Sequence, residues 1–386
     1  MSSPSDVLIV GASVGGLTVA QALRRKGYTG RIRLVGEEPH PPYDRPPLSK
    51  EILTGAWPAS RAQLNLDGLD ADLILGVRAV RLDLSAWQVH LDNGRRLPYG
   101  TLVIATGLSP RRLPTQQRLD GVHTFRTLDD ALALGRDLRN AERIAVIGAG
   151  VLGCELAAAA RALGRDVTLI DPASVPMAGQ LGDQLGTLMA SLHRRHDVKL
   201  RTGAGVATLT HVRGRVTGVA LTDGSAVAAD LAIVAIGSTP AIGWLAGSGL
   251  RLYDGIECDA YGRAGPGVYA VGDVARPLGS VRLENRANAT EQAVTVAATI
   301  LGDGRPYTPV AYFWTEQYDA KIQVYGTITA GSRLRLIEGQ LDEERFVALA
   351  ETGGTVTAAI GWNHPCGARS ARQHLMKVPG KPVGQE

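Results

Sequence analysis

The chain has few cysteines, and none is placed for local redox chemistry or for metal binding. Its 386 residues include three, Cys154, Cys258 and Cys366, which lie far apart and form no CxxC spacing. This spacing excludes a disulfide between near neighbours and carries no metal-site signature. Few cysteines of this kind are typical of a reducing compartment, so we expect a cytoplasmic protein.

Strong net charge and long apolar runs are also missing. The formal charge is +4, with Lys and Arg scattered along the chain. This weak bias does not favour nucleic acid or an anionic membrane as the main partner, although it is compatible with an acidic protein partner. The polar residues 1–6 lead into an apolar segment too short to span a bilayer, and they lack the features of a signal peptide. The length and the 45% of hydrophobic residues predict a globular chain with two or three cores.

An internal repeat indicates how the chain is organised. Residues 7–107 predict an apolar strand, a glycine-rich turn, a helix and a second strand, then a hairpin at Asn93-Gly94 and a last apolar strand. Residues 144–237 repeat this order, with the hairpin at Asp223-Gly224. Both dipeptides favour a type I′ turn, in which the two central residues take positive φ. The repeat therefore predicts an α/β fold with two similar dinucleotide-binding units.

The first unit opens with a glycine-rich turn between a strand and a helix. It contains Gly11, Ser13, Gly15 and Gly16, with Ser13 at the position of the second fingerprint glycine. The missing side chain at Gly11 allows a tight turn, and the small residues after it let a pyrophosphate approach the helix N-terminus, where unpaired N–H groups favour an anion. The next strand leads to Glu37, whose carboxylate could accept hydrogen bonds from an adenosine ribose.

The second unit carries the unmodified GxGxxG spacing in Gly148, Gly150 and Gly153, and its second strand ends at Asp171. A lone glycine cluster is more often an ordinary turn, but the strand before it, the helix after it and the acid at this distance favour dinucleotide binding. A carboxylate at Asp171 would bond both ribose hydroxyls of NAD and repel the additional phosphate of NADP. Residues 172–174 supply no arginine for that phosphate, so the sequence predicts NADH.

Further segments follow in a characteristic order. They are PPYDRPPLSK at 41–50, Ala105-Thr106-Gly107, FRTLDD at 125–130, YAVGD at 269–273 and YFWTEQYD at 312–319. Together they resemble the markers of the flavoprotein ferredoxin reductases of the putidaredoxin reductase type, which feed bacterial cytochrome P450s and Rieske oxygenases. The resemblance covers nearly the whole chain.

The resemblance implies FAD in the first unit and NAD in the second, in a glutathione-reductase-like fold. This fold has two Rossmann-like dinucleotide-binding domains and a small α+β C-terminal domain. The implied domains are a discontinuous FAD-binding domain at 1–112 and 241–311, an NAD-binding domain at 113–240 and a C-terminal domain at 312–386.

Lys50 is the first candidate for a catalytic residue. Pro46 and Pro47 stiffen the segment before it, so Lys50 can be held in one position with little further loss of conformational entropy. A lysine is most often solvated. In the resembling family, however, the matching lysine lies near the reactive edge of the flavin and pairs with a glutamate that matches Glu155. A buried lysine needs such a counter-charge. The resemblance therefore implies catalytic roles for Lys50 and Glu155, where the nicotinamide meets the flavin.

The resemblance also implies other cofactor contacts. Asp273 is similar to the aspartate that bonds the ribityl chain of FAD, Arg45 would lie beside the pyrophosphate or the ring, and Arg126 resembles a second-half contact to FAD. Trp314 could cover the flavin or serve packing, and both alternatives stay open. The complete set of expected cofactor-binding residues is Gly11, Ser13, Gly15, Gly16, Glu37, Arg45, Lys50, Val80, Ala105, Thr106, Gly107, Arg126, Gly148, Gly150, Gly153, Asp171, Gly237, Gly272, Asp273, Arg286 and Trp314.

The chain departs from the family pattern at two positions. Relatives carry an apolar or aromatic residue where this chain has Arg286. A guanidinium there would favour negative charge on the reduced flavin and raise its potential, or it could point to solvent. Cys154 replaces a residue that is usually aliphatic, and we expect it to pack as a small hydrophobe without a redox role.

The cysteine pattern also separates this chain from relatives with the same plan. Disulfide reductases need a thiol pair beside the flavin, and peroxide or coenzyme A disulfide reductases need one reactive cysteine there, but residues 1–153 contain none. The expected reaction is hydride transfer from NADH to FAD, followed by single-electron transfer to an acidic 2Fe-2S ferredoxin or a rubredoxin. Two alternatives stay open: an NADH oxidase or small-molecule reductase that acts directly, and an NADH-sensing interaction flavoprotein.

Overall fold

The computed structural model describes residues 6–114 and 119–377 and divides the chain into two compact units. Unit 1 comprises Met1–Pro47, Pro58–Pro110 and Ser238–Pro309, and unit 2 comprises Leu48–Trp57, Arg111–Gly237 and Val310–Glu386. The three domain boundaries expected from the sequence remain a prediction. Among the described residues, no helix is long and apolar enough to cross a membrane.

Unit 1 is built on a sheet with the strand order β20-β21-β7-β1-β2-β3. All neighbours in it are parallel except β20 and β21. The strands of unit 1 are β1 (Asp6–Val10), β2 (Arg31–Val35), β3 (Asp72–Ile74), β4 (Ala79–Asp83), β5 (Gln88–Leu91), β6 (Arg96–Pro98), β7 (Thr101–Ile104), β8 (Leu108–Pro110), β17 (Ser238–Pro240), β18 (Leu252–Tyr253), β19 (Gly255–Cys258), β20 (Arg263–Gly265), β21 (Val268–Ala270) and β22 (Ala275–Pro277). Its helices are α1 (Val14–Arg25) and α6 (Arg286–Ile300), with short 3-10 turns η2 (Ala59–Ala62), η3 (Gly243–Leu245) and η4 (Gly272–Val274).

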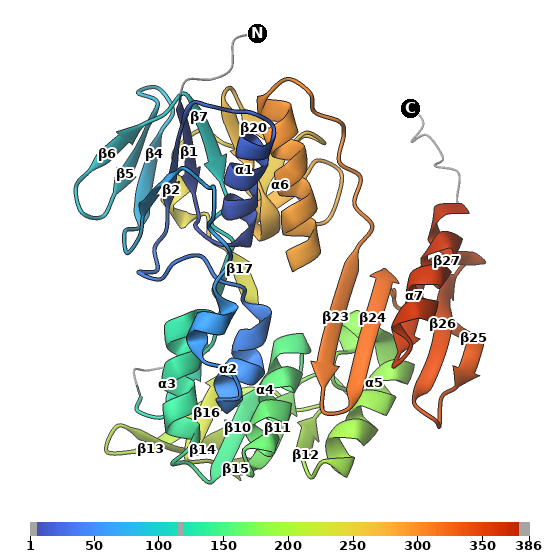
Figure 1. The fold of residues 1–386 in the computed structure, drawn as a ribbon. Helices are drawn as coiled ribbons and strands as arrows, with labels where there is room; N and C mark the ends of the chain where they lie inside the picture. Colours follow the sequence, from blue (N-terminus) through green and yellow to red (C-terminus); the bar gives the residue numbers. More distant parts are fainter. Residues whose placement is uncertain (1–5, 115–118, 378–386) are drawn as a thin grey trace. The chain divides into compact units, whose positions relative to one another are not determined.

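Successive side chains of the central strands enter two different cores, because neighbours on a strand point to opposite faces of the sheet. On one face, Val7 and Ile9 pack with α1 and α6, which lie side by side in Figure 1. On the other face, Leu8 and Val10 pack with the antiparallel sheet β4-β5-β6. Burial on both faces explains why β1 is apolar along nearly its whole length.

Unit 2 repeats this plan with a parallel sheet of order β12-β11-β10-β16-β9 and an antiparallel sheet β13-β14-β15. Its strands are β9 (Val122–Thr124), β10 (Arg143–Ile147), β11 (Asp166–Asp171), β12 (Lys199–Thr202), β13 (Val206–Val212), β14 (Arg215–Leu221), β15 (Ala226–Ala228), β16 (Leu231–Val234), β23 (Tyr312–Gln317), β24 (Ala320–Gly326), β25 (Arg333–Gln340), β26 (Arg345–Thr352) and β27 (Thr355–Trp362). Its helices are α2 (Glu51–Thr54), α3 (Leu128–Leu138), α4 (Val151–Ala162), α5 (Ala178–Arg195), α7 (Pro365–Ala371) and the 3-10 turn η5 (Arg372–Lys377), while η1 (Pro46–Ser49) spans the junction of the two units in the sequence.

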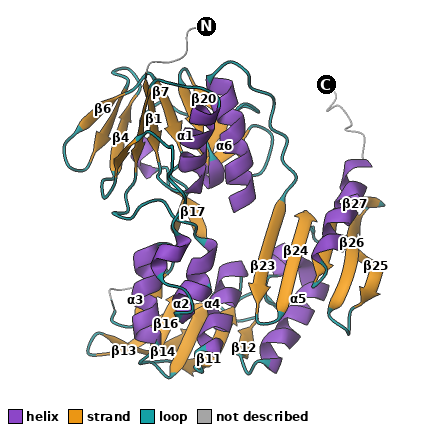
Figure 2. Ribbon diagram, in the orientation of Figure 1, coloured by secondary structure: helices purple, strands orange, loops and turns teal. Residues whose placement is uncertain are grey.

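The last five strands form an antiparallel sheet of order β23-β24-β27-β26-β25. The helix α7 packs on β24, β26 and β27, as Figure 2 shows. Together with the two parallel sheets, this arrangement confirms the expected fold class of two dinucleotide-binding units and a small α+β C-terminal region.

Matching hydrogen bonds confirm the internal repeat in atomic detail. In unit 1, Gly11 N–H donates to the carbonyl of Val35 at 2.8 Å, and Ala105 N–H donates to the carbonyl of Val10 at 2.7 Å. In unit 2, Gly148 N–H donates to Ile170 at 2.8 Å and Ala235 N–H donates to Ile147 at 2.7 Å. Each glycine turn is therefore joined in the same way to the strands on both sides of it.

Both predicted hairpins are present, but the predicted type I′ turn is wrong. Gly94 and Gly224 take positive φ, 82° and 84°, whereas Asn93 and Asp223 are not among the described non-glycine residues with positive φ. Their side chains instead accept backbone hydrogen bonds two residues later, from Arg95 at 3.1 Å and from Ser225 at 2.9 Å. This local bonding is a common property of Asn and Asp, and it stabilises a turn that needs only the glycine at positive φ.

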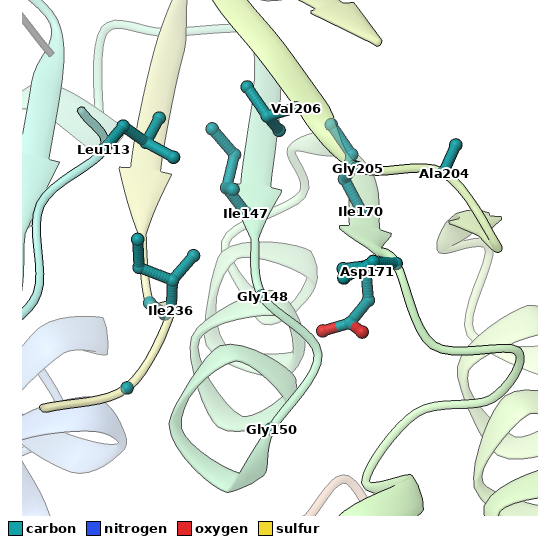
Figure 3. Close-up of a pocket in the computed structure, with 13 residues that line it drawn as sticks. Leu113, Ile147, Gly148, Gly150, Ile170, Asp171, Ala204, Gly205, Val206 and Ile236 are labelled. Atoms are coloured by element: carbon teal, nitrogen blue, oxygen red, sulfur yellow. The ribbon is translucent and has the colours of Figure 1, made fainter. Parts of the chain in front are cut away.

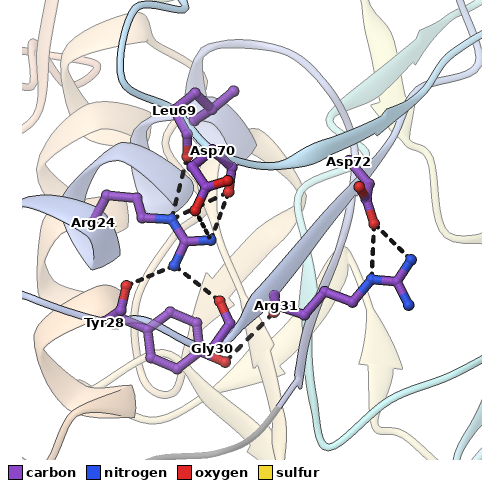
Figure 4. Close-up of polar contacts among 7 residues, drawn as sticks. All are labelled: Arg24, Tyr28, Gly30, Arg31, Leu69, Asp70 and Asp72. Carbon is purple, nitrogen blue, oxygen red and sulfur yellow. Dashed lines mark hydrogen bonds and ion pairs between the residues drawn. The ribbon is translucent and has the colours of Figure 1, made fainter.

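The helix α1 is anchored at its C-terminal end by Arg24 (Figure 4). The guanidinium donates to the carbonyl oxygens of Tyr28 at 2.6 Å and Gly30 at 2.9 Å, and it pairs with the Asp70 carboxylate at 3.4 Å. A cation near the last carbonyls of a helix also interacts favourably with the helix dipole. These contacts stabilise the helix whose other end forms the first glycine turn.

Candidate functional site

The turn before α1 forms a backbone cradle that requires glycine at two positions. Gly11 has φ of 119°, and a Cβ atom there would collide with the Ala105 carbonyl. A Cβ at Gly16 would collide with the carbonyl of Gly11, so α1 can approach the turn closely only without that side chain. Gly15 has more room, since its Cβ would lie 3.3 Å from Val271. Ser13 is the N-cap and makes no capping bond through its side chain, which leaves the first N–H groups of α1 available to an anion.

The turn before α4 has the same construction. Gly148 has φ of 101°, and its Cβ would collide with the Ala235 carbonyl, while a Cβ at Gly153 would collide with Gly148. Gly150 is the N-cap of α4, and its Cβ would meet nothing within 4 Å. Open space at an uncapped helix N-terminus fits a pyrophosphate group. Both turns therefore fit the dinucleotides that the sequence predicts.

A cavity of about 380 Å³ lies beside this second turn (Figure 3). It is lined by Leu113, Ile147, Gly148, Gly150, Ile170, Asp171, Pro172, Ala204, Gly205, Val206, Ala235, Ile236 and Gly237. Its volume is at the small end of the range for ligand pockets and fits a nucleoside better than a whole dinucleotide. Asp171 is the only ionisable residue in this lining, so the cavity offers hydroxyl acceptors and no cation.

The carboxylate of Asp171 is fixed by backbone donors. Oδ2 accepts a hydrogen bond from Ala149 N–H at 2.6 Å, and Oδ1 accepts one from Ala173 N–H at 2.8 Å. Both bonds fix the direction of the carboxylate, which points toward the cavity, as Figure 3 shows. A fixed anion at this place suits a ribose diol and disfavours an additional phosphate.

The acid expected in unit 1 has a different environment. The Glu37 side chain is 69% exposed, and its carboxylate lies 3.9 Å from the guanidinium of Arg78. The neighbouring Glu38 is more enclosed, because it accepts hydrogen bonds from Tyr43 and, at 2.9 Å, from Arg45. The ribose contact of Glu37 stays a prediction, and Glu38 is the carboxylate that the PPYDRPPLSK segment surrounds.

Arg45 and Asp273, two expected FAD contacts, influence each other within unit 1. Burial opposes the charge of Arg45, but Tyr43, Glu38 and Asp273 outweigh it and raise the pKa of the guanidinium above its ordinary value. Asp273 lies in η4, directly after Gly272, whose φ is 77°. The structure therefore places a permanent cation near the carboxylate expected to hold the ribityl chain.

Arg286 is exposed and forms an ion pair with Asp44, so both of its expected arrangements, beside the flavin or toward solvent, stay open. Its Nε lies 2.7 Å and 2.9 Å from the two carboxylate oxygens of Asp44, and its side chain is 41% exposed. The carboxylate pairs with the guanidinium, and the expected effect of Arg286 on the flavin potential stays a prediction. The pair connects the N-terminus of α6 to the PPYDRPPLSK segment.

Lys50 and Glu155 form an ion pair inside unit 2. The distance from Nζ to Oε2 is 2.7 Å, and the two side chains are 15% and 9% exposed. Glu155 lies in the second turn of α4, and Lys50 precedes the short helix α2. Trp314 on β23 completes the group, since Lys50 Nζ lies 5.3 Å from the centre of its ring, a cation–π geometry. The three residues come from three separate parts of the sequence.

The other expected residues are placed by local structure. Gly107 and Gly237 end the last strands of the two repeats with φ of 66° and 89°. The hydroxyl of Thr106 donates to the Ala241 carbonyl at 2.9 Å. Arg126 lies just before the capping box of α3, and Val80 on β4 is 41% exposed. Contacts of these residues with a cofactor stay predictions.

The sequence did not indicate several residues that bond the expected site residues, or each other, within the two units. They are Glu38, Asp44, Ser49, Thr315 and Gln317. Ser49 and Thr315 bond Glu155 across 106 and 160 residues of sequence, and Asp44 bonds Arg286 across 242. Asp44 and Ser49 lie inside the PPYDRPPLSK segment, and Thr315 and Gln317 lie inside the YFWTEQYD segment, whereas Glu38 lies just before the first segment and had no such signal.

Comparison with known proteins agrees with this architecture. Residues 5–293 match the family model described as pyridine nucleotide-disulphide oxidoreductase, and residues 312–379 match the model described as reductase C-terminal. The ferredoxin–NAD(+) reductase component of the p-cumate 2,3-dioxygenase system of Pseudomonas putida is 39% identical over 338 residues, which cover 86% of this chain and 83% of that protein.

Two solved structures are similar over nearly their whole length. The ferredoxin reductase for the CYP199A2 system from Rhodopseudomonas palustris is 32% identical, with a TM-score of 0.92 over 97% of this chain and 96% of that one. Putidaredoxin reductase, in its covalent complex with putidaredoxin, is also 32% identical, with a TM-score of 0.91 over 97% of this chain and 93% of that one. The chain therefore belongs to the pyridine nucleotide-disulphide oxidoreductase family.

Proposed function

We propose that the chain is an FAD-dependent NADH:ferredoxin oxidoreductase, which passes electrons from NADH to a 2Fe-2S ferredoxin that serves a P450 or Rieske oxygenase. The observation that carries the proposal is the pair of glycine cradles, built alike around Gly11 and Gly148, in a chain with no cysteine before Cys154. Two dinucleotide sites without a thiol at the first favour direct electron transfer over disulfide or peroxide chemistry.

Cys154 does not supply the missing thiol. Its side chain is fully buried, and its Sγ lies 3.4 Å from the Ala149 carbonyl. Burial, together with the charges of Asp171 and Glu155, raises the pKa of the Cys154 thiol well above its ordinary value. Because the thiolate is the reactive form, we expect no thiol chemistry from this buried cysteine.

The first cradle would hold FAD, with its pyrophosphate at the N-terminus of α1 and with Asp273 toward the ribityl chain. The second would hold NADH, with its adenosine ribose on Asp171. When bound, FAD would take an electron pair from the nicotinamide and release electrons singly, a conversion that flavins perform and nicotinamides do not.

The residues of the chain contribute orientation and electrostatics to this reaction. Glu155 holds the Lys50 ammonium at a fixed point, and the Trp314 ring lies beside it. A fixed positive charge, which needs no reorganisation during the reaction, stabilises negative charge that develops close to it. Lys50 is thus the residue to which we assign the main catalytic contribution, with Glu155 as its partner.

We further propose a cytoplasmic location. All three cysteines of the chain are free thiols in the structure, including the exposed Cys366. Free thiols persist in a reducing compartment.

Anaerobic stopped-flow mixing with NADH, followed by a screen of 2Fe-2S ferredoxins, tests this function. We expect rapid bleaching of the flavin absorbance and steady NADH consumption only when a ferredoxin is present. Steady consumption with oxygen or a small molecule alone would favour an oxidase or a direct reductase. A long-lived charge-transfer band without turnover would favour an NADH-sensing interaction protein.

A further inference from the structure

The Glu155 carboxylate is surrounded by hydrogen-bond donors on both oxygens. Oε2 accepts from Ser49 Oγ at 2.7 Å and lies 2.7 Å from Lys50 Nζ, while Oε1 accepts from Thr315 Oγ1 at 2.9 Å. Ser49 and Lys50 are neighbours in the sequence and share Oε2. Thr315 reaches Glu155 from β23 and is the only described side chain that hydrogen-bonds Oε1, so its hydroxyl helps to fix the orientation of the carboxylate that pairs with Lys50.

The direction of the Thr315 hydroxyl is set by its neighbour two residues later. Gln317 Nε2 donates to Thr315 Oγ1 at 3.1 Å. A hydroxyl group has one hydrogen, and its oxygen here already accepts the amide hydrogen. The hydroxyl hydrogen therefore remains free to point at Glu155, and the chain of donors runs from Gln317 through Thr315 to the carboxylate.

The Gln317 amide is itself held in an enclosed setting. Thr315 and Gln317 are 0% and 2% exposed, and Gln317 Nε2 also lies 3.7 Å from the sulfur of Met177. Beyond them lies His193, which donates or accepts at 3.0 Å with the Tyr318 hydroxyl. Burial, with a contribution from His196, lowers the pKa of His193 to about 4, so this neighbour is uncharged at neutral pH. In surroundings of low polarity, each hydrogen bond on a carboxylate is strong and directional.

We propose that Thr315 is a positioning residue for the Lys50–Glu155 pair and that Gln317 acts through it. This inference rests on the role proposed above for Lys50. Thr315 holds the carboxylate in the rotamer that fixes the ammonium, and Gln317 holds the Thr315 hydroxyl in its donating direction. Glu155 lies in α4, and Thr315 and Gln317 lie in β23. The C-terminal sheet therefore contributes directly to the geometry of the Lys50–Glu155 pair.

Replacing Thr315 by valine tests the inference, because valine keeps the shape and removes the hydroxyl. In the FAD-bound protein we expect the rate constant of flavin reduction by NADH to fall about fivefold or more, since a hydrogen bond to a charged group contributes more than a neutral one. Thr315→Ser should stay within about twofold of the wild-type rate, because it keeps the donor. Thr357→Val, on β27 of the same sheet, is the control. Among the described residues, the Thr357 hydroxyl bonds only the Ala350 carbonyl, so its removal should leave the rate constant of flavin reduction unchanged.

Two double-mutant cycles distinguish a positioning role of Thr315 from a general loss of structure. Gln317→Met should slow flavin reduction in the wild-type background and add nothing to Thr315→Val, because its effect passes through the hydroxyl. The second readout is the thermal midpoint of the holoprotein, in which Thr315→Val and Glu155→Gln should be non-additive. Additive effects in both cycles would refute the relay.

Failure of the inference can be distinguished from failure of the proposed function. If Lys50→Met slows flavin reduction while Thr315→Val leaves it unchanged, the Lys50 site stands and the role of Thr315 is refuted. If Lys50→Met also leaves the rate unchanged, the role of Lys50 fails, and the inference falls with it. If Thr315→Ser is as slow as Thr315→Val, the hydroxyl is not the active feature, which also contradicts the inference.

Discussion

Glutamine in place of Glu155 removes the charge of a side chain that is 9% exposed, and with it the carboxylate that pairs with Lys50, which is 15% exposed. At a separation of 2.7 Å, the attraction between the two charges is about 6 kcal/mol for an effective dielectric constant of roughly 20, before the loss of hydration is subtracted. Removal of one partner from a buried pair typically destabilises a protein by about 3–5 kcal/mol. We therefore expect Glu155→Gln to lower the free energy of unfolding by about this amount.

The single and double replacements distinguish the pair from two independent residues. Lys50→Met keeps most of the volume of the stem and removes the charge, so FAD should remain bound while its reduction by NADH slows, on the order of 10- to 100-fold. In Lys50→Met combined with Glu155→Gln, neither charge is left alone. The double variant should therefore be more stable than the sum of the single effects predicts, by about 1–3 kcal/mol.

The assay combines chemical denaturation, followed by circular dichroism, with anaerobic stopped-flow absorbance of the flavin. Wild type and the three variants are measured at equal FAD occupancy, so that differences in cofactor content do not enter the rates. Strictly additive free energies would show that the residues do not interact in solution. An unchanged reduction rate in Lys50→Met would show that Lys50 is not part of the reactive site.

Three further predictions follow from other parts of the structure. NADH should reduce the flavin about 5- to 150-fold faster than NADPH. Asp171→Ala, combined with an arginine introduced just after it, should reduce this ratio of rates. Equal rates with the two nucleotides in wild type would refute the role of Asp171. Iodoacetamide should modify the exposed Cys366 and leave the buried Cys154 unmodified, and the rate of ferricyanide reduction by NADH should not change. If mass spectrometry linked a loss of activity to modification of Cys154, electron transfer without thiols would be contradicted. Burial lowers the pKa of His193 to about 4 from 6.5, so between these pH values the unfolded chain binds a proton that the folded chain excludes. The free energy of unfolding should therefore be highest above pH 6.5 and fall toward pH 4. In urea titrations, His193→Gln should show a weaker dependence of this free energy on pH.

The repeated units could be predicted from the sequence because their signals are local. A glycine at φ of 119° or 101°, directly after a buried strand, gives a pattern that can be recognised from consecutive residues. The turn type of the hairpins could not be predicted in the same way. Asn93 and Asp223 accept either a positive φ or a side-chain bond to the backbone, and only the structure shows that the second occurs.

The surroundings of the catalytic pair were less predictable, because they depend on contacts between distant segments. The resemblance to a family indicated that Lys50 pairs with Glu155, but no pattern indicated the Thr315 hydroxyl, which comes from β23, 160 residues beyond Glu155. For Arg286 the sequence left a place beside the flavin or in solvent open, and it indicated no partner. Its partner Asp44 lies 242 residues away, in a loop whose conformation is set by the fold.

Electron transfer from NADH to a ferredoxin can be followed in a single turnover. The protein is reduced anaerobically with one equivalent of NADH and then mixed with an oxidised 2Fe-2S ferredoxin, while the flavin and the iron–sulfur absorbance are followed together. We expect the flavin to be reoxidised as two equivalents of ferredoxin become reduced, because each ferredoxin accepts one electron. A reduced flavin that persists beside oxidised ferredoxins, across the whole set tested, and that is reoxidised only by oxygen or a small molecule would contradict the proposed function.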